Sequence, residues 1–225
     1  MSQPPAADDA FALARQEMVE RQLRGRGIRD QRVIAAMARV PRERFVPPSL
    51  ADLAYSDQAL PIDCEQTISQ PLIVALMSEA LRLSGHERVL EVGTGSGYQS
   101  AVLAEMLRGG DGGQVITIER HLVLAEQSRE RLAALGHRRV RVVTGDGMLG
   151  FPQEAPFNGI LVAAAGSEPP PALLDQLAEG GRLVMPVGGR AEQDLRIIEK
   201  TEAGDLIETS LGGCRFVPLL PGLGE

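Results

Sequence analysis

Hydrophobic positions near the start of the chain follow the helical period. Between Asp8 and Leu23 the apolar side chains fall on one stripe, which predicts a helix, and Gly25 and Gly27 indicate where it ends. A second helix is predicted to begin after Asp30, a good N-cap residue. It must end before Pro41, because the residue preceding a proline disfavours the helical region. The pattern therefore predicts an opening pair of helices.

No clear hydrophobic period is present from Pro47 to Gln66, and several prolines interrupt this segment. We expect a long loop there, and long loops often carry function. The pattern becomes helical again from Pro71 to Leu83, where apolar residues cover most of the helix surface and predict a well-buried helix. Ser69 stands just before this helix and is predicted to be its N-cap.

The central part of the chain alternates short β-rich runs with helical runs. The predicted strands are Arg88–Val92, Gln114–Ile118, Val140–Val143, Gly159–Ala163 and Arg182–Val187. The predicted helical segments are Tyr98–Leu107, Leu122–Leu135, Met148–Gln153 and Pro171–Ala178. Strands that alternate with helices form parallel βαβ units, so this pattern predicts a parallel sheet covered by helices.

The C-terminal pattern predicts strands that close one edge of this sheet. The runs 195–199 and 206–211 flank a turn and predict a hairpin, and Cys214–Leu219 predicts one more short strand. The complete pattern predicts an α/β fold, a Rossmann-like, doubly wound and mostly parallel sheet with an N-terminal helical cap, in one domain over residues 1–225. We expect residues 8–66 to form the cap and a substrate-side loop, and residues 67–225 to form the core with its C-terminal edge strands.

Composition limits the classes of partner. The chain has 225 residues, 44% of them hydrophobic, which is enough for one substantial core. Its net charge is −7 and its basic residues are scattered, so nucleic acid is not an expected partner. The sequence has no apolar run of transmembrane length, and Met1–Ala10 lacks the pattern of a signal peptide. We therefore expect a soluble, cytoplasmic protein without a membrane partner. Cys64 and Cys214 match no metal or redox spacing, so no metal is expected.

A glycine-rich segment is the strongest local signal. The predicted strand ending at Val92 runs into Gly93, Gly95 and Gly97, and a helix is predicted to start at Tyr98. Glycine lets the backbone approach a ligand closely, and the first turn of the helix offers free N–H groups to it. This arrangement is typical of a nucleotide-binding loop, although a tight strand-to-helix turn without a ligand would have the same pattern.

The type of nucleotide follows from the residues around the glycines. A dinucleotide fingerprint has a small residue three positions after its second glycine, but the two possible registers place Tyr98 or Ser100 there. Glu91 ends the strand two residues before the first glycine, where a carboxylate would repel a pyrophosphate but suits a ligand with an ammonium and a sulfonium group. S-adenosylmethionine (SAM) is such a ligand, and these features predict a class I SAM-dependent methyltransferase.

Two further acids follow the next predicted strands. Glu119 follows the second strand, where an acid can accept both hydroxyls of a ribose, and Asp146 follows the third, where it could accept from the adenine amino group. Taken singly, either acid could also be a helix cap or a turn residue. Three acids after three successive strands favour a nucleoside site at the carboxyl edge of the sheet.

With this loop in place, the chain from Met18 to Leu220 resembles the protein-L-isoaspartate O-methyltransferase family. The segments that carry the resemblance are 41–46 (PRERFV), 60–62 (LPI), 66–71 (QTISQP), 89–104, 145–147 (GDG), 156–157 with 162–165, 176–177 with 180–188, and 215–219 (RFVPL). The glycine loop is common to many methyltransferases, whereas the QTISQP and RFVPL segments are more specific to this family.

The resemblance implies methylation of the α-carboxylate of L-isoaspartyl residues in damaged proteins or peptides, followed by closure of the ester to a succinimide that reopens partly to aspartate. It also implies that Ser69 is the catalytic residue. The hydroxyl of Ser69 could orient an anionic acceptor, but it could equally be only a helix cap. The residues expected to bind the cofactor are Thr67, Glu91, Gly93, Thr94, Gly95, Gly97, Glu119, Asp146 and Gly147. Those expected to bind the substrate are Ile68, Ser69, Arg215, Phe216 and Val217.

One departure from the family pattern affects the expected site. The family commonly has Gly-x-Gly before Gln66, whereas this chain has Asp63, Cys64 and Glu65, and we expect the two carboxylates to lie on the acceptor side and repel an anionic acceptor. Arg215 could neutralise Glu65. Three alternatives therefore stay open: a carboxyl methyltransferase for an ordinary aspartate of a particular peptide, a SAM-binding protein with little turnover, and a nicotinamide dehydrogenase.

Overall fold

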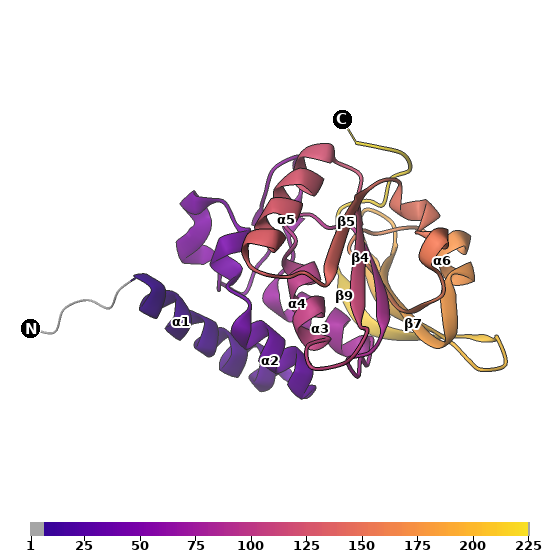
Figure 1. Cartoon of the computed structure of the whole chain (residues 1–225), viewed down its shortest axis with the longest axis horizontal. Coiled ribbons are helices and arrows are strands. Elements are labelled where there is room, and N and C mark those ends of the chain that lie inside the picture. Colours follow the sequence, from indigo (N-terminus) through magenta and orange to yellow (C-terminus); the bar gives the residue numbers. More distant parts are fainter. Residues whose placement is uncertain (1–6, 225) are drawn as a thin grey trace, which may run out of the picture.

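A seven-stranded sheet forms the centre of the molecule (Figure 1). The computed structural model describes residues 7–224, so most of the segment on which the signal-peptide expectation rests lies outside the described residues. The strand order is β5-β4-β3-β6-β7-β8-β9; β5 to β7 are parallel, and β8 and β9 are added antiparallel. The strands are β3 (Arg88–Val92), β4 (Gln114–Glu119), β5 (Val140–Thr144), β6 (Phe157–Val162), β7 (Leu177–Gly188), β8 (Gln193–Lys200) and β9 (Leu206–Cys214). The predicted doubly wound sheet and its edge hairpin are confirmed.

Helices lie on both sides of the sheet. In Figure 1, α3, α4 and α5 lie on one side, with α1 and α2 outside them, and α6 lies on the other. The bounds are α1 (Ala7–Glu17), α2 (Gln31–Arg39), α3 (Pro71–Ala80), α4 (Tyr98–Met106), α5 (Leu122–Ala134) and α6 (Pro171–Asp175). The predicted helix over 148–153 is instead two short 3-10 turns, Gly147–Leu149 and Pro152–Glu154. Glycine and proline at their ends leave no room for a longer helix.

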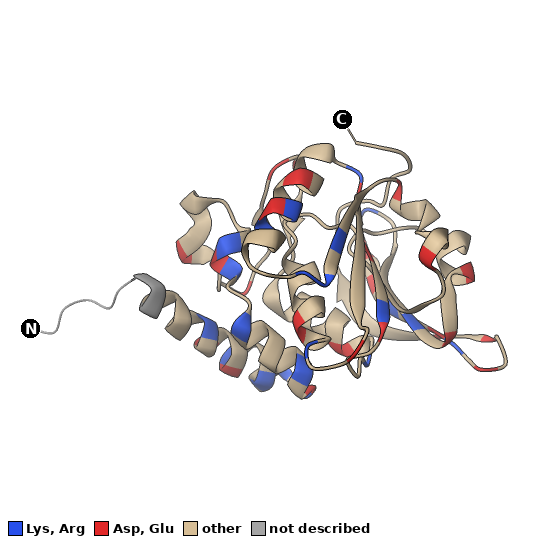
Figure 2. Cartoon of the chain, in the orientation of Figure 1, with Lys and Arg blue, Asp and Glu red and all other residues tan. Residues whose placement is uncertain are grey.

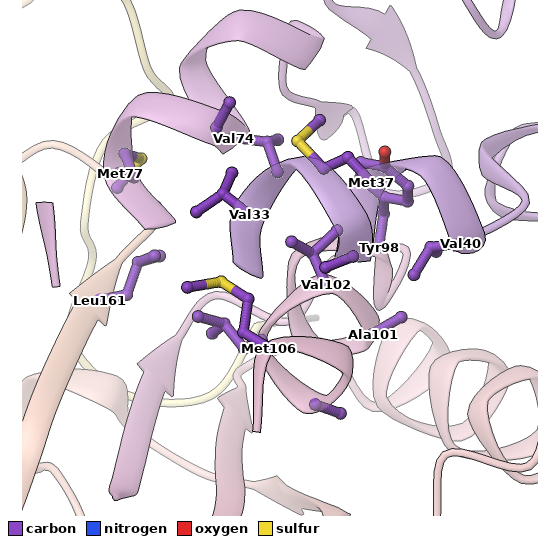
Figure 3. Packing of buried hydrophobic residues seen from close by; sticks show 14 of the residues in the cluster. Val33, Met37, Val40, Val74, Met77, Tyr98, Ala101, Val102, Met106 and Leu161 are labelled. Carbon is purple, nitrogen blue, oxygen red and sulfur yellow. The ribbon is translucent and has the colours of Figure 1, made fainter. Parts of the chain in front are cut away.

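The two opening helices form as their signals predict. After α1 the chain continues as a π-helical turn (Met18–Leu23) and a 3-10 turn (Arg24–Arg26), which ends at Gly27 with a left-handed φ of 102°. Asp30 caps α2, and its carboxylate accepts hydrogen bonds from the N–H groups of Arg32 and Val33. Figure 3 shows how α2 is held: Val33 lies between Val74 of α3 and Val102 of α4. The cap is thus part of the larger hydrophobic core.

Alternation along the strands divides the core into two layers. Val89 and Val115 belong to the cluster on the cap side, whereas Leu90 and Ile116 belong to the cluster on the side of α6. Because side chains alternate along a strand, Glu91 points to the same side as Val89, towards α4. This placement decides the surroundings of Glu91.

The segment between α2 and α3 is more ordered than the sequence predicts. It contains two 3-10 turns, Arg42–Phe45 and Pro48–Leu53, and a small hairpin made by β1 (Leu60–Pro61) and β2 (Thr67–Ile68). Strands of two residues leave no recognisable period. The prediction that Ser69 caps α3 is wrong: Gln70 is the N-cap, because its carbonyl accepts the first helical hydrogen bond, from Val74.

The predicted strand Cys214–Leu219 is also wrong. Strand β9 ends at Cys214, and the following segment makes only an isolated bridge between Pro218 and Ala165. The N–H of Ala165 donates to the carbonyl of Val217 and the N–H of Leu219 donates to the carbonyl of Ala165, so the two bonds lie on either side of Pro218 and the pairing is a single bridge. The segment therefore runs away from the edge hairpin and towards the ends of the parallel strands.

Charged residues of both signs are interspersed over the ribbon (Figure 2). Within residues 7–224, no helix is both long and apolar enough to cross a bilayer. The side chains that the structure describes, those of residues 10–224, include no cluster of three or more His, Cys, Asp or Glu able to hold a metal ion.

Candidate functional site

A cavity of about 340 Å³ opens at the carboxyl ends of β3, β4 and β6. Its lining includes the glycine loop, Glu119 and Gly147, together with residues of β2 and of the C-terminal segment. Its position is the switch point of the sheet, since β4 and β6 flank β3 on opposite sides. Ligands of doubly wound sheets bind at this point, and cavities of this size hold small molecules.

The glycine loop forms the floor of this cavity, which we call the cofactor cavity. Gly93, Gly95 and Gly97 all have positive φ angles, of 92°, 52° and 88°, which L side chains rarely adopt. A Cβ atom on Gly97 would also lie 3.3 Å from Leu132 of α5. The hydroxyl of Thr94, between the glycines, lies 2.7 Å from that of Thr117 on β4. The glycines are therefore needed to bring the loop backbone to the cavity.

Glu119 lies at the end of β4 and is only 4% exposed. One of its carboxylate oxygens accepts a hydrogen bond of 2.8 Å from the N–H of Gly95, and the other accepts one of 3.0 Å from the N–H of His121. These bonds fix the carboxylate in the wall of the cofactor cavity with its remaining lone pairs free for a ligand. The site thus fits a ligand with vicinal hydroxyls, such as a ribose.

Glu91 has a different environment from the one we expected. Its side chain is fully buried, accepts a hydrogen bond from Ser100 of α4, and does not line the cofactor cavity. Burial raises the pKa of Glu91 to about 8, more than the bonds from Ser100 and Thr117 lower it. The carboxyl group joins β3 to α4 through Ser100, and a direct contact with a cationic ligand stays a prediction.

Asp146 is held by backbone groups as well. It accepts hydrogen bonds from the N–H of Met148, at 2.9 Å, and from the N–H of Gly222 in the C-terminal tail, at 2.7 Å. Gly147 lines the cofactor cavity, whereas the side chain of Asp146 does not. A contact between Asp146 and adenine therefore also stays a prediction.

The C-terminal tail is a part of the site that sequence reasoning missed. The guanidinium of Arg120 donates to the carbonyls of Pro221, Gly222 and Leu223, at distances of 3.1 to 3.4 Å. In return, the N–H of Gly224 donates to the carbonyl of Arg120. Leu219 and Leu220 line the cofactor cavity just before this clamp. In the sequence, Arg120 is a single basic residue after Glu119, and no motif around it predicts a contact with the C-terminal tail.

A second cavity, of about 260 Å³, adjoins the first, and we call it the acceptor cavity. Four residues line both cavities, namely Thr67, Ser69, Ala163 and Val217. Arg215 and Phe216 line the acceptor cavity only, whereas Ile68 lines the cofactor cavity. Ser69 therefore lies where the two cavities meet, as do the other three shared residues.

The wall formed by the C-terminal segment is fixed by a side chain from the edge hairpin. Gln193 of β8 accepts a hydrogen bond of 2.6 Å from the N–H of Phe216 and donates one of 3.1 Å to its carbonyl. These two bonds replace the strand pairing that the sequence predicted there. They hold the backbone of residues 215–217 against the acceptor cavity.

The departure before Gln66 lies on the cofactor side, not on the acceptor side. Cys64 and Glu65 both have a φ of 57°, in the left-handed region, and turn the chain between β1 and β2. Glu65 lines the cofactor cavity, and Asp63 accepts a hydrogen bond from Gln127 of α5. No ion pair joins Glu65 to Arg215 within the described chain. The expectation that these carboxylates face the acceptor cavity is therefore corrected.

The sheet, the glycine loop and the acid after β4 together define a class I SAM-dependent methyltransferase. The family model described as Protein-L-isoaspartate(D-aspartate) O-methyltransferase (PCMT) matches residues 14–223. The chain belongs to this family.

Relatives of similar length support this membership. A protein-L-isoaspartate O-methyltransferase of Syntrophobacter fumaroxidans is 52% identical over 210 residues, which cover 93% of this chain and 95% of the relative. One from Methanoregula boonei is 51% identical and covers 93% and 94%.

Solved structures share the fold. A protein-L-isoaspartate O-methyltransferase superposes with a TM-score of 0.81 at 30% identity, covering 93% of this chain and 67% of the other. A Plasmodium falciparum structure of the same description, in complex with S-adenosyl-L-homocysteine, gives a TM-score of 0.78 at 27% identity and covers 92% and 98%.

Proposed function

We propose that this chain transfers the methyl group of SAM to the α-carboxylate of L-isoaspartyl residues in proteins or peptides. The observation that carries this proposal is the position of Ser69 at the junction of the two cavities. When bound, SAM supplies an electrophilic methyl group on a sulfonium. The residues of this protein must hold the cofactor and orient the acceptor.

Holding the cofactor is the first requirement. We assign Glu119 to the ribose hydroxyls, because its carboxylate is prepositioned by two backbone bonds and faces the cavity. The glycine loop and Gly147 supply backbone and space, and Thr67 lies opposite them. Glu91 bonds to Ser100 of the helix that follows the loop, and Asp146 bonds to Gly222 of the tail.

Orienting the acceptor is the second requirement. A carboxylate is ionised at neutral pH and needs no general base, so alignment and exclusion of water are the main contributions of the enzyme. The hydroxyl of Ser69 can donate to one acceptor oxygen and direct the other towards the cofactor cavity. Arg215 lines the acceptor cavity and can attract the anion. The two bonds from Gln193 to Phe216 hold the neighbouring backbone of residues 215 and 217 against this cavity, where it can meet the peptide. Methyl transfer then leaves a neutral ester, which is a better target than a carboxylate for the neighbouring backbone nitrogen. When that nitrogen attacks the ester carbonyl, it loses its proton and the C–O bond to the methoxy group breaks, so that methanol leaves and the succinimide closes.

Methyl incorporation into an isoaspartyl peptide, measured beside its aspartyl isomer, tests the proposal. We expect transfer to the isoaspartyl peptide only. Transfer to the aspartyl isomer alone would identify a different carboxyl methyltransferase. Binding of S-adenosylhomocysteine without transfer to either peptide would identify a cofactor-binding protein and contradict the proposal.

A further inference from the structure

Arg42 is a fully buried cation without an acidic partner. Its side chain is 0% exposed, and no carboxylate among residues 10–224, whose side chains the structure describes, forms an ion pair with it. Its neighbour Glu43 is bound instead by Arg15 and Tyr55. Burial lowers the pKa of Arg42, against the raising effect of Tyr98 and Tyr55. Burying a charge is costly unless it is well bonded, so the bonds that Arg42 makes indicate why it is there.

The bonds of Arg42 join three segments around the proposed active site. Its Nη2 donates a hydrogen bond of 2.7 Å to the carbonyl of Ser69, and its Nε donates one of 2.7 Å to the carbonyl of Ala54. Its guanidinium also lies over the ring of Tyr98, 4.7 Å from the centroid. Tyr98 begins α4 directly after the glycine loop and lines the cofactor cavity. Arg42 thus contacts Ala54 of the cap, Ser69 between the two cavities, and Tyr98 at the start of α4.

The carbonyl of Ser69 has no helical role that would fix it otherwise. Helix α3 starts one residue later, with Gln70 as its N-cap and Pro71 in its first turn. Ser69 itself lies between strand β2 and this helix, so its backbone conformation depends on contacts with other segments and not on helix or strand hydrogen bonds. The carbonyl accepts a hydrogen bond from the charged guanidinium of Arg42. Hydrogen bonds from a charged donor are shorter and stronger than those between neutral groups.

We infer that Arg42 is a positioning residue for methyl transfer, which holds the backbone of Ser69 so that its hydroxyl faces the acceptor. This inference rests on the proposed function. Only arginine fits the position, because its planar fork reaches two carbonyls in different directions while its face stacks on Tyr98. A lysine keeps the charge but has a single nitrogen, and cannot make these contacts together.

The test combines Arg42→Lys with Ser69→Ala in a double-mutant cycle on an isoaspartyl peptide. Wild-type transfer is measured first, because its absence would contradict the proposed function and not the inference. Rates are expressed per site that binds S-adenosylhomocysteine, so that only folded protein is compared. We expect Arg42→Lys to lower kcat/KM about tenfold, while the Kd for S-adenosylhomocysteine changes less than twofold.

The cycle separates positioning from a structural role. If Arg42 acts through Ser69, Arg42→Lys lowers kcat/KM little further in the Ser69→Ala background. The inference would be overturned if the double variant lost kcat/KM by the product of the two single losses. It would also be overturned if Arg42→Lys lost cofactor affinity as much as kcat/KM. Arg15→Lys is the matched control, since Arg15 is an arginine of the same cap that bonds Glu43 and Tyr55 but not Ser69. Its kcat/KM should stay near wild type. Arg42→Gln, which keeps a donor but removes the charge, is the second variant if the lysine protein does not fold.

Discussion

The cofactor cavity and the acceptor cavity are built in different ways. The cofactor cavity lies on strand ends whose register is set by parallel pairing, and its main acid is held by backbone N–H groups from nearby loops. The acceptor cavity is assembled from the short hairpin, Ser69 and the segment after β9, which meet only in the folded chain. Single side chains, Arg42 and Gln193, fix the backbone there. We therefore expect single substitutions to disturb methyl transfer at the second cavity more than ligand binding at the first.

The largest effect is expected on the acceptor side. Ser69→Ala should lower kcat/KM for an isoaspartyl peptide about 100-fold, because a misaligned acceptor loses most of the benefit of proximity. Affinity for S-adenosylhomocysteine should stay within twofold. Since Gln70 and not Ser69 caps α3, the free energy of unfolding should also change little. Steady-state kinetics, calorimetry and urea unfolding check the three expectations.

Ser49→Ala is the control for this prediction, because Ser49 is exposed and makes no contact with either cavity. A folded Ser69→Ala protein with wild-type turnover would remove Ser69 from the mechanism. A loss of cofactor affinity as large as the loss of kcat/KM would show instead that the two cavities are not separable at this residue.

A smaller effect is expected on the cofactor side, and it should differ between its two acids. Glu119→Ala should weaken binding of S-adenosylhomocysteine by roughly 1–2 kcal/mol, because it leaves the N–H groups of Gly95 and His121 and the ribose without this carboxylate. Asp146→Ala should cost less, since its side chain does not line the cavity. Calorimetry on both variants measures which of them loses more affinity for S-adenosylhomocysteine, and Glu130→Ala, at an exposed position, is the control. Equal losses would show that Asp146 also contacts the ligand.

The same division explains which features the sequence could predict. The glycine loop, Glu119 and Gly147 follow predicted strands, and parallel pairing brings strand ends together without further information. Thr67 and Ser69 were assigned only through the family resemblance, and the cap role of Ser69 was wrong because the proline at Pro71 shifts the start of the helix.

Features that depend on long-range contacts left no pattern to find. The bond from Arg42 to Ser69 spans 27 positions, and the clamp of Arg120 on the C-terminal tail spans about 100. The side of the sheet to which Glu91 points follows from strand alternation, which the sequence shows. The sequence does not show that α4 covers that side and buries the carboxyl group. Cys214–Leu219 has the composition of a strand, yet Gln193 pairs with its backbone instead of a ladder.

The clamp on the tail is expected to have the next largest effect. Arg120→Ala removes three hydrogen bonds to the tail that follows Leu219 and Leu220 in the wall of the cofactor cavity. We expect S-adenosylhomocysteine to dissociate roughly three- to tenfold faster, because exposed hydrogen bonds of this kind each contribute modestly. Stopped-flow displacement measures the rate. Exposed Arg190→Ala is the control, and an unchanged rate for Arg120→Ala would mean that the tail does not hold the ligand.

The smallest effect is expected at the turn before Gln66, where Glu65 has a left-handed φ of 57°. Such a conformation costs a non-glycine residue about 1 kcal/mol, which Glu65→Gly should recover in part, raising Tm by roughly 2 °C. Glu202→Gly, at an exposed turn without positive φ, is the control and should not be stabilising. Because Glu65 lines the cofactor cavity, Glu65→Gly should change the Kd for S-adenosylhomocysteine and leave the KM for the isoaspartyl peptide unchanged. If the KM for the peptide instead became lower and less dependent on salt, the Glu65 carboxylate would be repelling the anionic acceptor, and its charge would act on both cavities.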